Sequence, residues 1–593
     1  MKKIKFILIM IFLCLLLNNS FAVNYDINEK LIAVILPFSS AFKGIAVEQQ
    51  NAINLFLEEN NKYQIVYKDS KSDAIGAVEA FNELLKMEKP PFAVISCASW
   101  VASALHPLAA KEGIFHIVIA SANFQRSIPH HTIRFTIDGS QEEKQLANYL
   151  TNFNNIAIYY MNNSYGIGWQ KNIKDNLGNK VGKEISYDPM KKDFIQDLEI
   201  IAETTPDALV LLSASKAAII AKEAREMGIE AQFVGTRPIE RPELLKEAEF
   251  TNGLVYTYPT YDQANPMLKK YKARYGMEPT IFGVEAYESI KCLVAASEDT
   301  DKSAEKLFNW FANKVITGAL GEVHFDENGD AHYPYMYKQI VNGEFVTAEF
   351  QYKLLLQSAK QEIDNTFSIM DSAVKQSAKN LSKSGIIGDE VTKELESLFK
   401  KTEFAYDVVT VDKSGIIRSV YPSEYSNIIG SNIMNQPQII KLHKTQKPVV
   451  SEAIETVEGF TGFDLEYPVF DDEKKFIGSV SVLTQPDFFE KVISQKISNF
   501  PVEIWIMQKD GTIVYDVNDE EIGLNIFEDE IYAPYKSLKE VAKNMAVEPS
   551  GEGKYFFLDT KMNETKLKKL IWTTISLHGT EFRLALSHIS NDL

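Results

Sequence analysis

Two kinds of hydrophobic pattern alternate along the first 350 or so residues of the chain. Runs that are apolar at nearly every position occur at 32–37, 63–67, 92–96, 115–119, 156–160, 208–212 and 232–235. Between them, apolar residues recur at three- and four-residue spacing at 45–60, 74–87, 99–112, 142–152, 168–177 and 215–227. Strands that are apolar on both faces and alternate with helices are typical of parallel sheets covered on both sides. Because this region is longer than one doubly wound unit, we expect two α/β lobes.

The pattern changes at residue 348. Residues 348–380 contain neither Pro nor Gly, and their apolar residues, among them Leu355, Ile363, Met370 and Val374, lie mostly three or four positions apart. This spacing predicts one long amphipathic helix. A break at 382–388 and a short helix at 390–400 follow. We interpret residues 348–400 as a rigid helical spacer.

Two strand-rich copies of one pattern follow, at 401–490 and 491–593. The first copy has predicted strands at 407–412 and 416–421, a helical zone, and strands at 464–470 and 476–483. The second has strands at 503–508 and 512–516, a helical zone, and strands at 554–558, 569–576 and 581–587. Each copy places a charged turn that ends in Gly after its first strand, at 413–415 and 509–511. The pattern predicts an antiparallel α+β module that is present twice.

The first 22 residues have the layout of a secretory signal peptide. Three lysines precede an apolar run at 6–17, and Ser20-Phe21-Ala22 ends it with a small-x-small pattern. Because the run is shorter than the roughly 20 residues of a membrane helix, we expect cleavage after Ala22 and a periplasmic or extracellular protein. A permanent N-terminal anchor is the alternative. Leu13 stands where a lipoprotein signal has a small residue, so we do not expect lipid attachment at Cys14.

Charge and composition reduce the number of function classes that we expect for this protein. Lys and Arg number 62 against 80 Asp and Glu, and the net charge of -18 repels phosphate backbones, so nucleic acid is not an expected partner. Cys97 and Cys292 are expected to be buried small hydrophobes, with a disulfide as the alternative. The nine histidines show no metal-ligand spacing, and neither a nucleophile elbow nor a phosphate-binding glycine loop occurs. We therefore expect no enzyme activity, no metal and no cofactor.

Four stretches of the first region resemble type I periplasmic solute-binding proteins of the branched-chain amino acid transporter class. They are 32–37 with the helix that follows, 92–100 running into 105–112, 159–168 (YYMNNSYGIG), and the helical Glu285-Ala286-Tyr287-Glu288. The resemblance covers residues 29–347. It implies a leucine-binding-like fold with two α/β lobes, three crossovers between them, and a cleft that closes on a small ligand.

Polar residues near the carboxyl ends of the predicted strands are the candidates for this cleft. In parallel α/β lobes, ligands bind at these strand ends, where helix N-termini offer N–H groups to an anion. Ser96, Cys97 and Ser99 follow one strand, and Ser121 and Asn123 follow the next, so both segments are candidate carboxylate cradles. Helix capping by Ser99 and a turn at Asn123 are the alternatives. Ser213 follows a strand of the second lobe and is a weaker candidate.

The resemblance also bears on two single positions. It implies that Tyr165 contacts the ligand from the second lobe, with packing at the hinge as the alternative. Amino-acid binders of the family carry, after the strand that ends like Phe233-Val234-Gly235, a carboxylate that pairs with the ligand's ammonium. This chain has Arg237 instead. A guanidinium there disfavours an ammonium and favours a carboxylate, which predicts an organic acid. The alternative is that Arg237 points to solvent or pairs with Glu240.

Residues 351–590 resemble double Cache sensory domains, which are extracellular modules with PAS-like sheets. The resemblance rests on 421–425 with 429–432, and on 447–451, 458–460, 467–470, 476–481, 505–511 and 551–555. It implies a small metabolite bound at the concave face of a sheet. Asp464 and Glu466 share one strand face and Leu465 and Tyr467 the other, and one of these faces must line the pocket. The candidate pocket residues of the first module are Tyr421, Tyr425, Ser451, Glu466 and Ser481.

Together these patterns predict an exported protein that binds and senses a small metabolite, either an organic acid or an amino-acid-like molecule. It would relay the occupancy of its cleft to a sensor kinase or chemoreceptor that acts in trans in the membrane. The alternative is the substrate-binding component of an ABC uptake transporter, which delivers its solute to a permease and carries the Cache region as an accessory.

Overall fold

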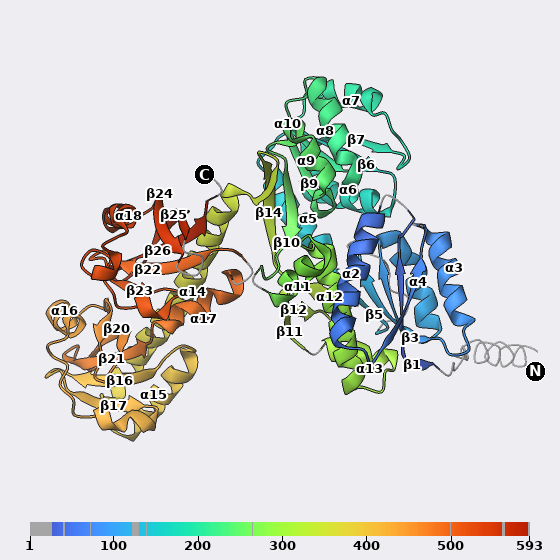
Figure 1. Cartoon of the computed structure of the whole chain (residues 1–593). Helices are drawn as coiled ribbons and strands as arrows, with labels where there is room; N and C mark the ends of the chain where they lie inside the picture. Colours follow the sequence, from blue (N-terminus) through green and yellow to red (C-terminus); the bar gives the residue numbers. More distant parts are fainter. Residues whose placement is uncertain are drawn as a thin grey trace, which may run out of the picture. The chain divides into compact units, whose positions relative to one another are not determined.

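The computed structural model describes residues 27–39, 42–71, 73–120, 130–137, 139–263, 265–312, 314–497, 500–559 and 564–590. The chain divides into two compact units, the first ending at Ala348 and the second beginning at Glu349 (Figure 1). The predicted signal peptide and the candidates Ser121 and Asn123 lie outside the described residues. Within those residues, the structure contains no helix with the length and apolar character needed to cross a membrane.

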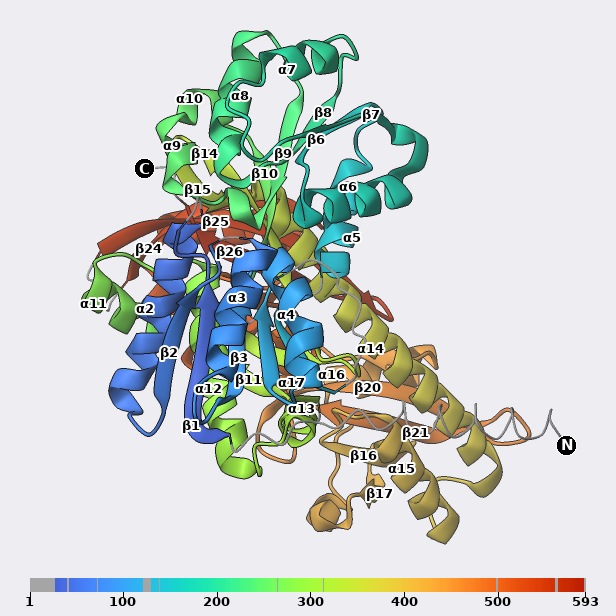
Figure 2. The same ribbon diagram turned by 90° about the vertical axis from the view of Figure 1, so that its right-hand side faces the viewer.

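The first lobe of the first unit is built on a sheet with the strand order β11-β12-β13-β5-β4-β3-β1-β2. Its strands are β1 (Asn28–Leu36), β2 (Gln64–Asp69), β3 (Pro91–Cys97), β4 (Phe115–Ile119), β5 (Thr132–Ile137), β11 (Ile316–Gly318), β12 (Gly321–Phe325) and β13 (Asp330–His332). The helices are α2 (Lys43–Glu59), α3 (Ala74–Leu85), α4 (Ser99–Lys111), α12 (Ile281–Asp299) and α13 (Ala304–Ala312). Figure 2 shows α3 and α4 side by side along the sheet. Because β3 and β4 are buried at every position, helices must cover both faces, as predicted.

The second lobe has the strand order β15-β14-β10-β9-β8-β6-β7. Its strands are β6 (Ile156–Met161), β7 (Val181–Tyr187), β8 (Ala208–Leu212), β9 (Gln232–Thr236), β10 (Val255–Pro259), β14 (Tyr335–Val341) and β15 (Glu344–Thr347). Its helices include α5 (Gly139–Leu150), α6 (Ser164–Leu177), α7 (Ile195–Ala202) and α8 (Ala217–Glu226), and α11 (Pro266–Tyr275) follows β10. The chain passes between the two sheets after β5, after β10 and after β13. These are the three crossovers that the resemblance implied.

Cys97 and Cys292 are both free and buried, as predicted. Cys97 ends β3 and Cys292 lies within α12. Burial raises the pKa of both thiols above the ordinary value, because a thiolate is poorly stabilised away from water.

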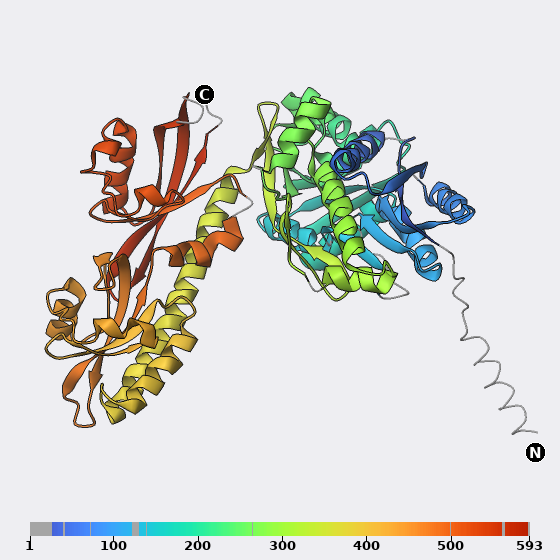
Figure 3. The same ribbon diagram turned by 60° about the horizontal axis from the view of Figure 1, so that its bottom comes forward.

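The second unit begins with the predicted long helix, α14 (Glu349–Ser384), which is followed by α15 (Asp389–Lys401). The apolar face of α14, which includes Leu355, Ile363 and Val374, is buried. It packs against strands of both sheets of the second unit and against α17 (Asp487–Ile497). In Figure 3 the yellow helix lies along the orange and red sheets. The helix is therefore part of the core of this unit, whereas the sequence suggested a spacer.

Two sheets with the same strand order form the rest of the second unit. The first module has the order β17-β16-β21-β20-β18 and the second has β23-β22-β26-β25-β24. The strands are β16 (Asp407–Asp412), β17 (Ile417–Tyr421), β18 (Val449–Val450), β20 (Thr461–Phe470), β21 (Phe476–Thr484), β22 (Glu503–Gln508), β23 (Ile513–Tyr515), β24 (Gly551–Asp559), β25 (Glu564–Leu577) and β26 (Thr580–Ile589). The short strand β19 (Ile454–Glu455) pairs with β20, and the modules also carry α16 (Pro437–Thr445) and α18 (Lys536–Val547).

The loops of the two modules repeat the same hydrogen bonds. The amide of Gly430 donates to the carbonyl of Ile417 at 2.9 Å, and the amide of Gly523 donates to Ile513 at 2.8 Å. Both glycines have positive φ, which a side chain would disfavour. The matching strand order and the matching bonds confirm the predicted duplication.

Candidate ligand-binding cleft

A hollow of about 560 Å³, part of it open to solvent, lies between the two lobes of the first unit. The first lobe supplies the start of α2, the ends of β3 and β4, the start of α4 and Thr136 of β5. The second lobe supplies the end of β6, Tyr165 of α6, Ala214 after β8, and Arg237 and Pro238 after β9. The hollow therefore sits beyond the carboxyl ends of parallel strands, where ligands of such lobes bind.

Most of the described wall is apolar. Phe42, Ile45, Trp100, Met161 and Phe282 enclose a space that suits an aliphatic or aromatic body. The indole Nε1 of Trp100 is buried and has no hydrogen-bond partner among the described residues. This N–H is thus a donor that a ligand oxygen would satisfy.

The start of α4 forms another part of the wall. Ala98 precedes the helix with a φ of 81°, a conformation that costs energy for alanine, and no side chain among the described residues caps the helix. Ala98 occupies the capping position, so the alternative that Ser99 caps this helix is wrong. Ala98, Ser99 and Trp100 all line the hollow. A helix start in this place favours an anionic group on the ligand.

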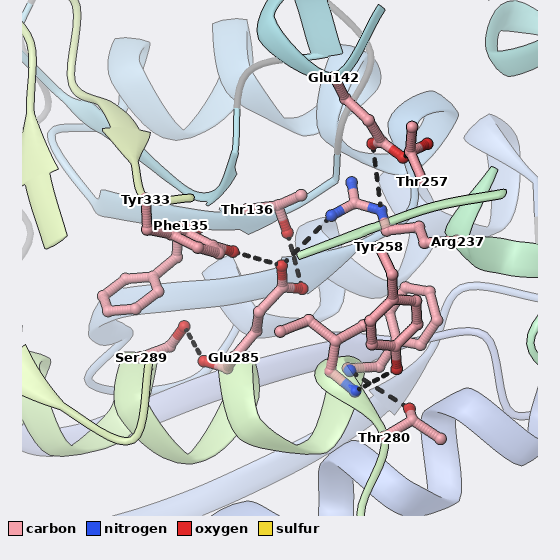
Figure 4. A network of polar contacts seen from close by, with 12 residues as sticks. Phe135, Thr136, Glu142, Arg237, Thr257, Tyr258, Thr280, Glu285, Ser289 and Tyr333 are labelled. Carbon is pink, nitrogen blue, oxygen red and sulfur yellow. Dashed lines mark hydrogen bonds and ion pairs between the residues drawn. The ribbon is translucent and has the colours of Figure 1, made fainter. Parts of the chain in front are cut away.

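Arg237 lies at the hollow and is held by two glutamates (Figure 4). Its side chain is only 3% exposed, with Nη1 at 3.4 Å from Oε1 of Glu285 and Nε at 3.9 Å from Oε2 of Glu142. The alternative that Arg237 points to solvent or pairs with Glu240 is wrong. Glu240 instead pairs with Lys338 at 2.6 Å and accepts a hydrogen bond from Tyr256.

Hydrogen-bond donors hold both glutamates in place. The hydroxyl of Thr257 donates to Oε1 of Glu142 at 2.6 Å. Glu285 accepts from Thr136 at 2.9 Å and from Tyr333 at 2.7 Å. Arg237 follows β9 of the second lobe, whereas Glu285 comes from α12, which packs on the first lobe. The ion pair of Arg237 with Glu285 therefore connects the two lobes at a residue that lines the hollow.

The charges of this network depend on one another. Burial raises the pKa of both Glu142 and Glu285, and Arg237 opposes that rise. Burial alone would lower the pKa of Arg237, but the two carboxylates raise it above its ordinary value. Arg237 therefore stays charged in the cleft. Among the described residues that line the hollow none is a carboxylate, since neither Glu142 nor Glu285 belongs to its wall.

The structure brings four of the predicted cleft residues to the hollow, Cys97, Ser99, Tyr165 and Arg237. The hydroxyl of Tyr165 also contacts the hydroxyl of Thr236. Ser96 does not reach the hollow, because it is buried within the sheet and bonds Nε2 of His116 at 2.7 Å. Ser213 is buried as well, and its neighbour Ala214 takes the place in the wall.

A second hollow, of about 320 Å³, lies on the first module of the second unit. It is on the sheet face of Asp464, and of the five predicted residues only Ser481 lines it. Tyr421 packs on Phe399, and Tyr425 stacks on Tyr406 with ring centres 4.6 Å apart. Ser451 accepts a hydrogen bond from the amide of Asp464 at 2.9 Å, and Glu466 accepts one from Ser479. None of these four residues is part of the wall of the hollow.

Comparison with known proteins shows two family matches along this chain. The family described as "Periplasmic binding protein" matches residues 31–344, and "HK/GC/Chemotaxis protein-like, sensor domain" matches residues 365–486. An extracellular ligand binding receptor from Desulfohalobium retbaense is 48% identical, with 94% of this chain and 99% of that chain covered and a TM-score of 0.58. The leucine binding protein LivK from Thermotoga maritima is 23% identical, with 54% of this chain and 97% of that chain covered and a TM-score of 0.50, and shares the fold. No curated protein matches the chain.

The family match covers more than half of the chain, and the receptor from Desulfohalobium retbaense is similar over nearly its whole length. The two-lobed α/β first unit agrees with both findings. The chain belongs to the periplasmic binding protein family, and a sensor domain follows its binding unit.

Proposed function

We propose that this protein is exported, binds a small organic acid in the cleft of its first unit, and relays the occupancy of that cleft to a membrane partner. The observation that carries the ligand class is Arg237, which stays charged at a hollow with no carboxylate among its described wall residues. The family supports small-molecule binding, and the sensor domain at 365–486 supports the relay.

The wall favours a carboxylate over an ammonium. Arg237, the indole N–H of Trp100 and the start of α4 all present positive or donor groups to the ligand. An α-ammonium would be desolvated beside Arg237, and Glu142 and Glu285, which pair with the guanidinium, are not among the residues that line the hollow. Binding of a zwitterionic amino acid therefore requires desolvation of its ammonium group beside a like charge, and binding of the corresponding keto acid does not.

The matched pair leucine and 4-methyl-2-oxopentanoate tests this ligand class. Both carry the same carboxylate and the same aliphatic body, and they differ only in the α-ammonium or keto oxygen. We expect calorimetry of the whole protein to show the keto acid bound at least about tenfold more tightly, which corresponds to about 1.4 kcal/mol. Arg237→Gln is expected to remove this preference, and Arg274→Gln, at an exposed position of α11, is the control. Tighter binding of leucine by the wild-type protein would reject the organic-acid class.

A pull-down with this protein from solubilised membranes of its own organism tests the relay, because it identifies the membrane partner. We expect a sensor kinase or chemoreceptor, since the second unit matches a sensor domain. The alternative function, delivery of the solute to an ABC permease, is favoured by the fold shared with a leucine binding protein and predicts recovery of a permease instead.

Export is tested on the protein itself. Cleavage after Ala22 predicts that N-terminal sequencing of the secreted or periplasmic protein begins at Val23. A protein that keeps its first 22 residues and sediments with membranes would instead be anchored, and the proposed cleavage would be wrong.

A further inference from the structure

A cation–π contact joins the two lobes of the first unit at the wall of its hollow. Phe42 directly precedes α2 of the first lobe and lines the hollow. Arg241 directly precedes α9 (Pro242–Lys246) of the second lobe, and its Cζ lies over the ring of Phe42, 5.5 Å from the ring centre. A guanidinium at this distance is attracted by the face of the ring. The contact therefore stabilises the arrangement of the two lobes that the structure shows.

Both partners of this contact are held by residues of the same wall. The ring of Phe42 packs on the ring of Trp100, with ring centres 5.2 Å apart. Nε of Arg241 donates to the carbonyl of Pro238 at 2.9 Å. Trp100 and Pro238 both line the hollow. A ligand in the hollow would thus meet, from each lobe, a residue that positions one half of the contact.

The ion pair of Arg237 with Glu285 also joins the lobes, but it lies beside the crossovers. Glu285 accepts hydrogen bonds from Thr136, near the end of β5, and from Tyr333, between β13 and β14. The chain passes from one lobe to the other directly after β5 and again between β13 and β14. Groups beside such a hinge stay close when two lobes rotate apart. The cation–π contact involves no crossover segment, so opening of the lobes would break it.

We propose that Arg241 and Phe42 form a latch that keeps the cleft closed and sets how fast its ligand is released. As regulation of the cleft, the latch rests on the proposed function for its ligand, whereas the contact itself exists in the protein without one. Latch and ligand favour the same closed state, so each should strengthen the effect of the other. The latch would thereby prolong the occupied state that the proposed relay reports.

Cys97 is a native reporter of cleft opening that needs no ligand. It lines the hollow and is 5% exposed, so a neutral thiol reagent such as iodoacetamide should reach it only when the lobes open. Cys292 in α12 is 3% exposed and is not among the residues that line the hollow, so its labelling reports unfolding instead. Peptide mass spectrometry of the whole protein measures both labelling rates in one sample.

Variants on both sides of the contact test the latch. Arg241→Gln removes the cation and should raise the labelling rate of Cys97 by about fivefold, with no change at the second cysteine. Phe42→Leu keeps an apolar side chain but removes the ring, so in this background Arg241→Gln should add less than about twofold. Lys314→Gln is the control, because it removes a cation that lies over Trp310 within the first lobe, and it should label like the wild type.

A ligand experiment separates the latch from the proposed function. In the wild-type protein, 4-methyl-2-oxopentanoate should slow the labelling of Cys97, and its dissociation rate should be about fivefold higher in Arg241→Gln. If the keto acid does not slow labelling but Arg241→Gln still raises the labelling rate, the proposed ligand class is wrong and the latch is supported.

Three results would overturn the latch. They are an unchanged labelling rate of Cys97 in Arg241→Gln, an equal rise at Cys97 and Cys292 in both single variants, and an undiminished effect of Arg241→Gln in the Phe42→Leu background. The second result would mean that the variants unfold the first unit. The third would mean that Arg241 acts through a different contact.

Discussion

Arg237 is a buried charge whose loss would leave two carboxylates without a cation. In Arg237→Met, Glu142 and Glu285 remain in the same buried region, and the free energy of unfolding of the first unit should fall by about 3–5 kcal/mol. Hydrogen exchange of peptides from β9 and α12, compared between variant and wild type, measures this change for the first unit alone.

A compensated variant separates charge from packing at Arg237. If unpaired carboxylates cause the loss, Arg237→Met combined with Glu142→Gln and Glu285→Gln should recover most of the stability. Arg274→Met, which removes a surface ion pair with Glu58 at 3.1 Å, should change stability by less than about 1 kcal/mol. An Arg237→Met protein as stable as the wild type would contradict the role assigned to this residue.

Glu48 makes the stability of the first unit depend on pH. Its carboxylate accepts hydrogen bonds from the amides of Thr280 and Gly283, at 2.6 and 3.0 Å, and so holds the start of α12. Burial nonetheless raises its pKa from 4.5 to about 7. Between these two values the folded state binds more protons than the unfolded state, so stability falls as pH rises through this window, by up to roughly 3 kcal/mol, and is level above it.

Glu48→Gln tests this dependence because glutamine keeps an acceptor oxygen but cannot ionise. Hydrogen exchange of α12 peptides should show the variant more stable than the wild type at pH 8 and similar to it at pH 5. Glu58→Gln, at an exposed position of the same helix α2, should keep the wild-type profile. A wild-type protein that grows more stable from pH 5 to pH 7 at α12 would contradict the raised pKa.

At the scale of elements, sequence patterns predicted most of the buried apolar strands and missed strands that carry polar residues, such as β5 and β10. The apolar runs at 156–160 and 407–412 became β6 and β16 with almost the same bounds. β5 was missed because its sequence, TIRFTI, includes Arg134, which is buried and paired with Asp330 of β13 at 2.8 Å. A charged residue interrupts the apolar pattern, and its partner lies nearly 200 positions away along the chain, so periodicity cannot reveal the pair.

The same limit applies to the cleft. Tyr165 and Arg237 could be placed at the cleft because the family resemblance covers the strand end that precedes each of them. The role of Glu142 and Glu285 was missed, since their partner Arg237 comes from another part of the sequence. The one local signal was an acidic residue within an otherwise uncharged stretch of α12, where 281–287 reads IFGVEAY. A buried acid in such a helix indicates a partner without identifying it.

Two adjacent leucines of α14 test whether this helix is part of the core of the second unit. Leu355 is 5% exposed, whereas Leu354 is 43% exposed. Leu355→Ala should lower the free energy of unfolding of the second unit by about 2–4 kcal/mol, and Leu354→Ala by less than about 1 kcal/mol. Hydrogen exchange of β20 and β25 peptides measures both effects. Equal, small effects of the two substitutions would mean that α14 is a free spacer after all.

At the scale of the whole molecule, the chain joins two units that each have their own sheets and core. Each unit also has a hollow of its own. We therefore expect scanning calorimetry to resolve two transitions, because unfolding of separate units need not be one cooperative event. A single transition at all ligand concentrations would mean that the units unfold together.

The ligand of the first unit should raise only the transition of that unit. At a concentration of about 100 times its dissociation constant, 4-methyl-2-oxopentanoate should stabilise the first unit by about 2.7 kcal/mol. Arg237→Gln should abolish this shift. If the ligand also moves the transition of the second unit, binding in the cleft is energetically coupled to that unit.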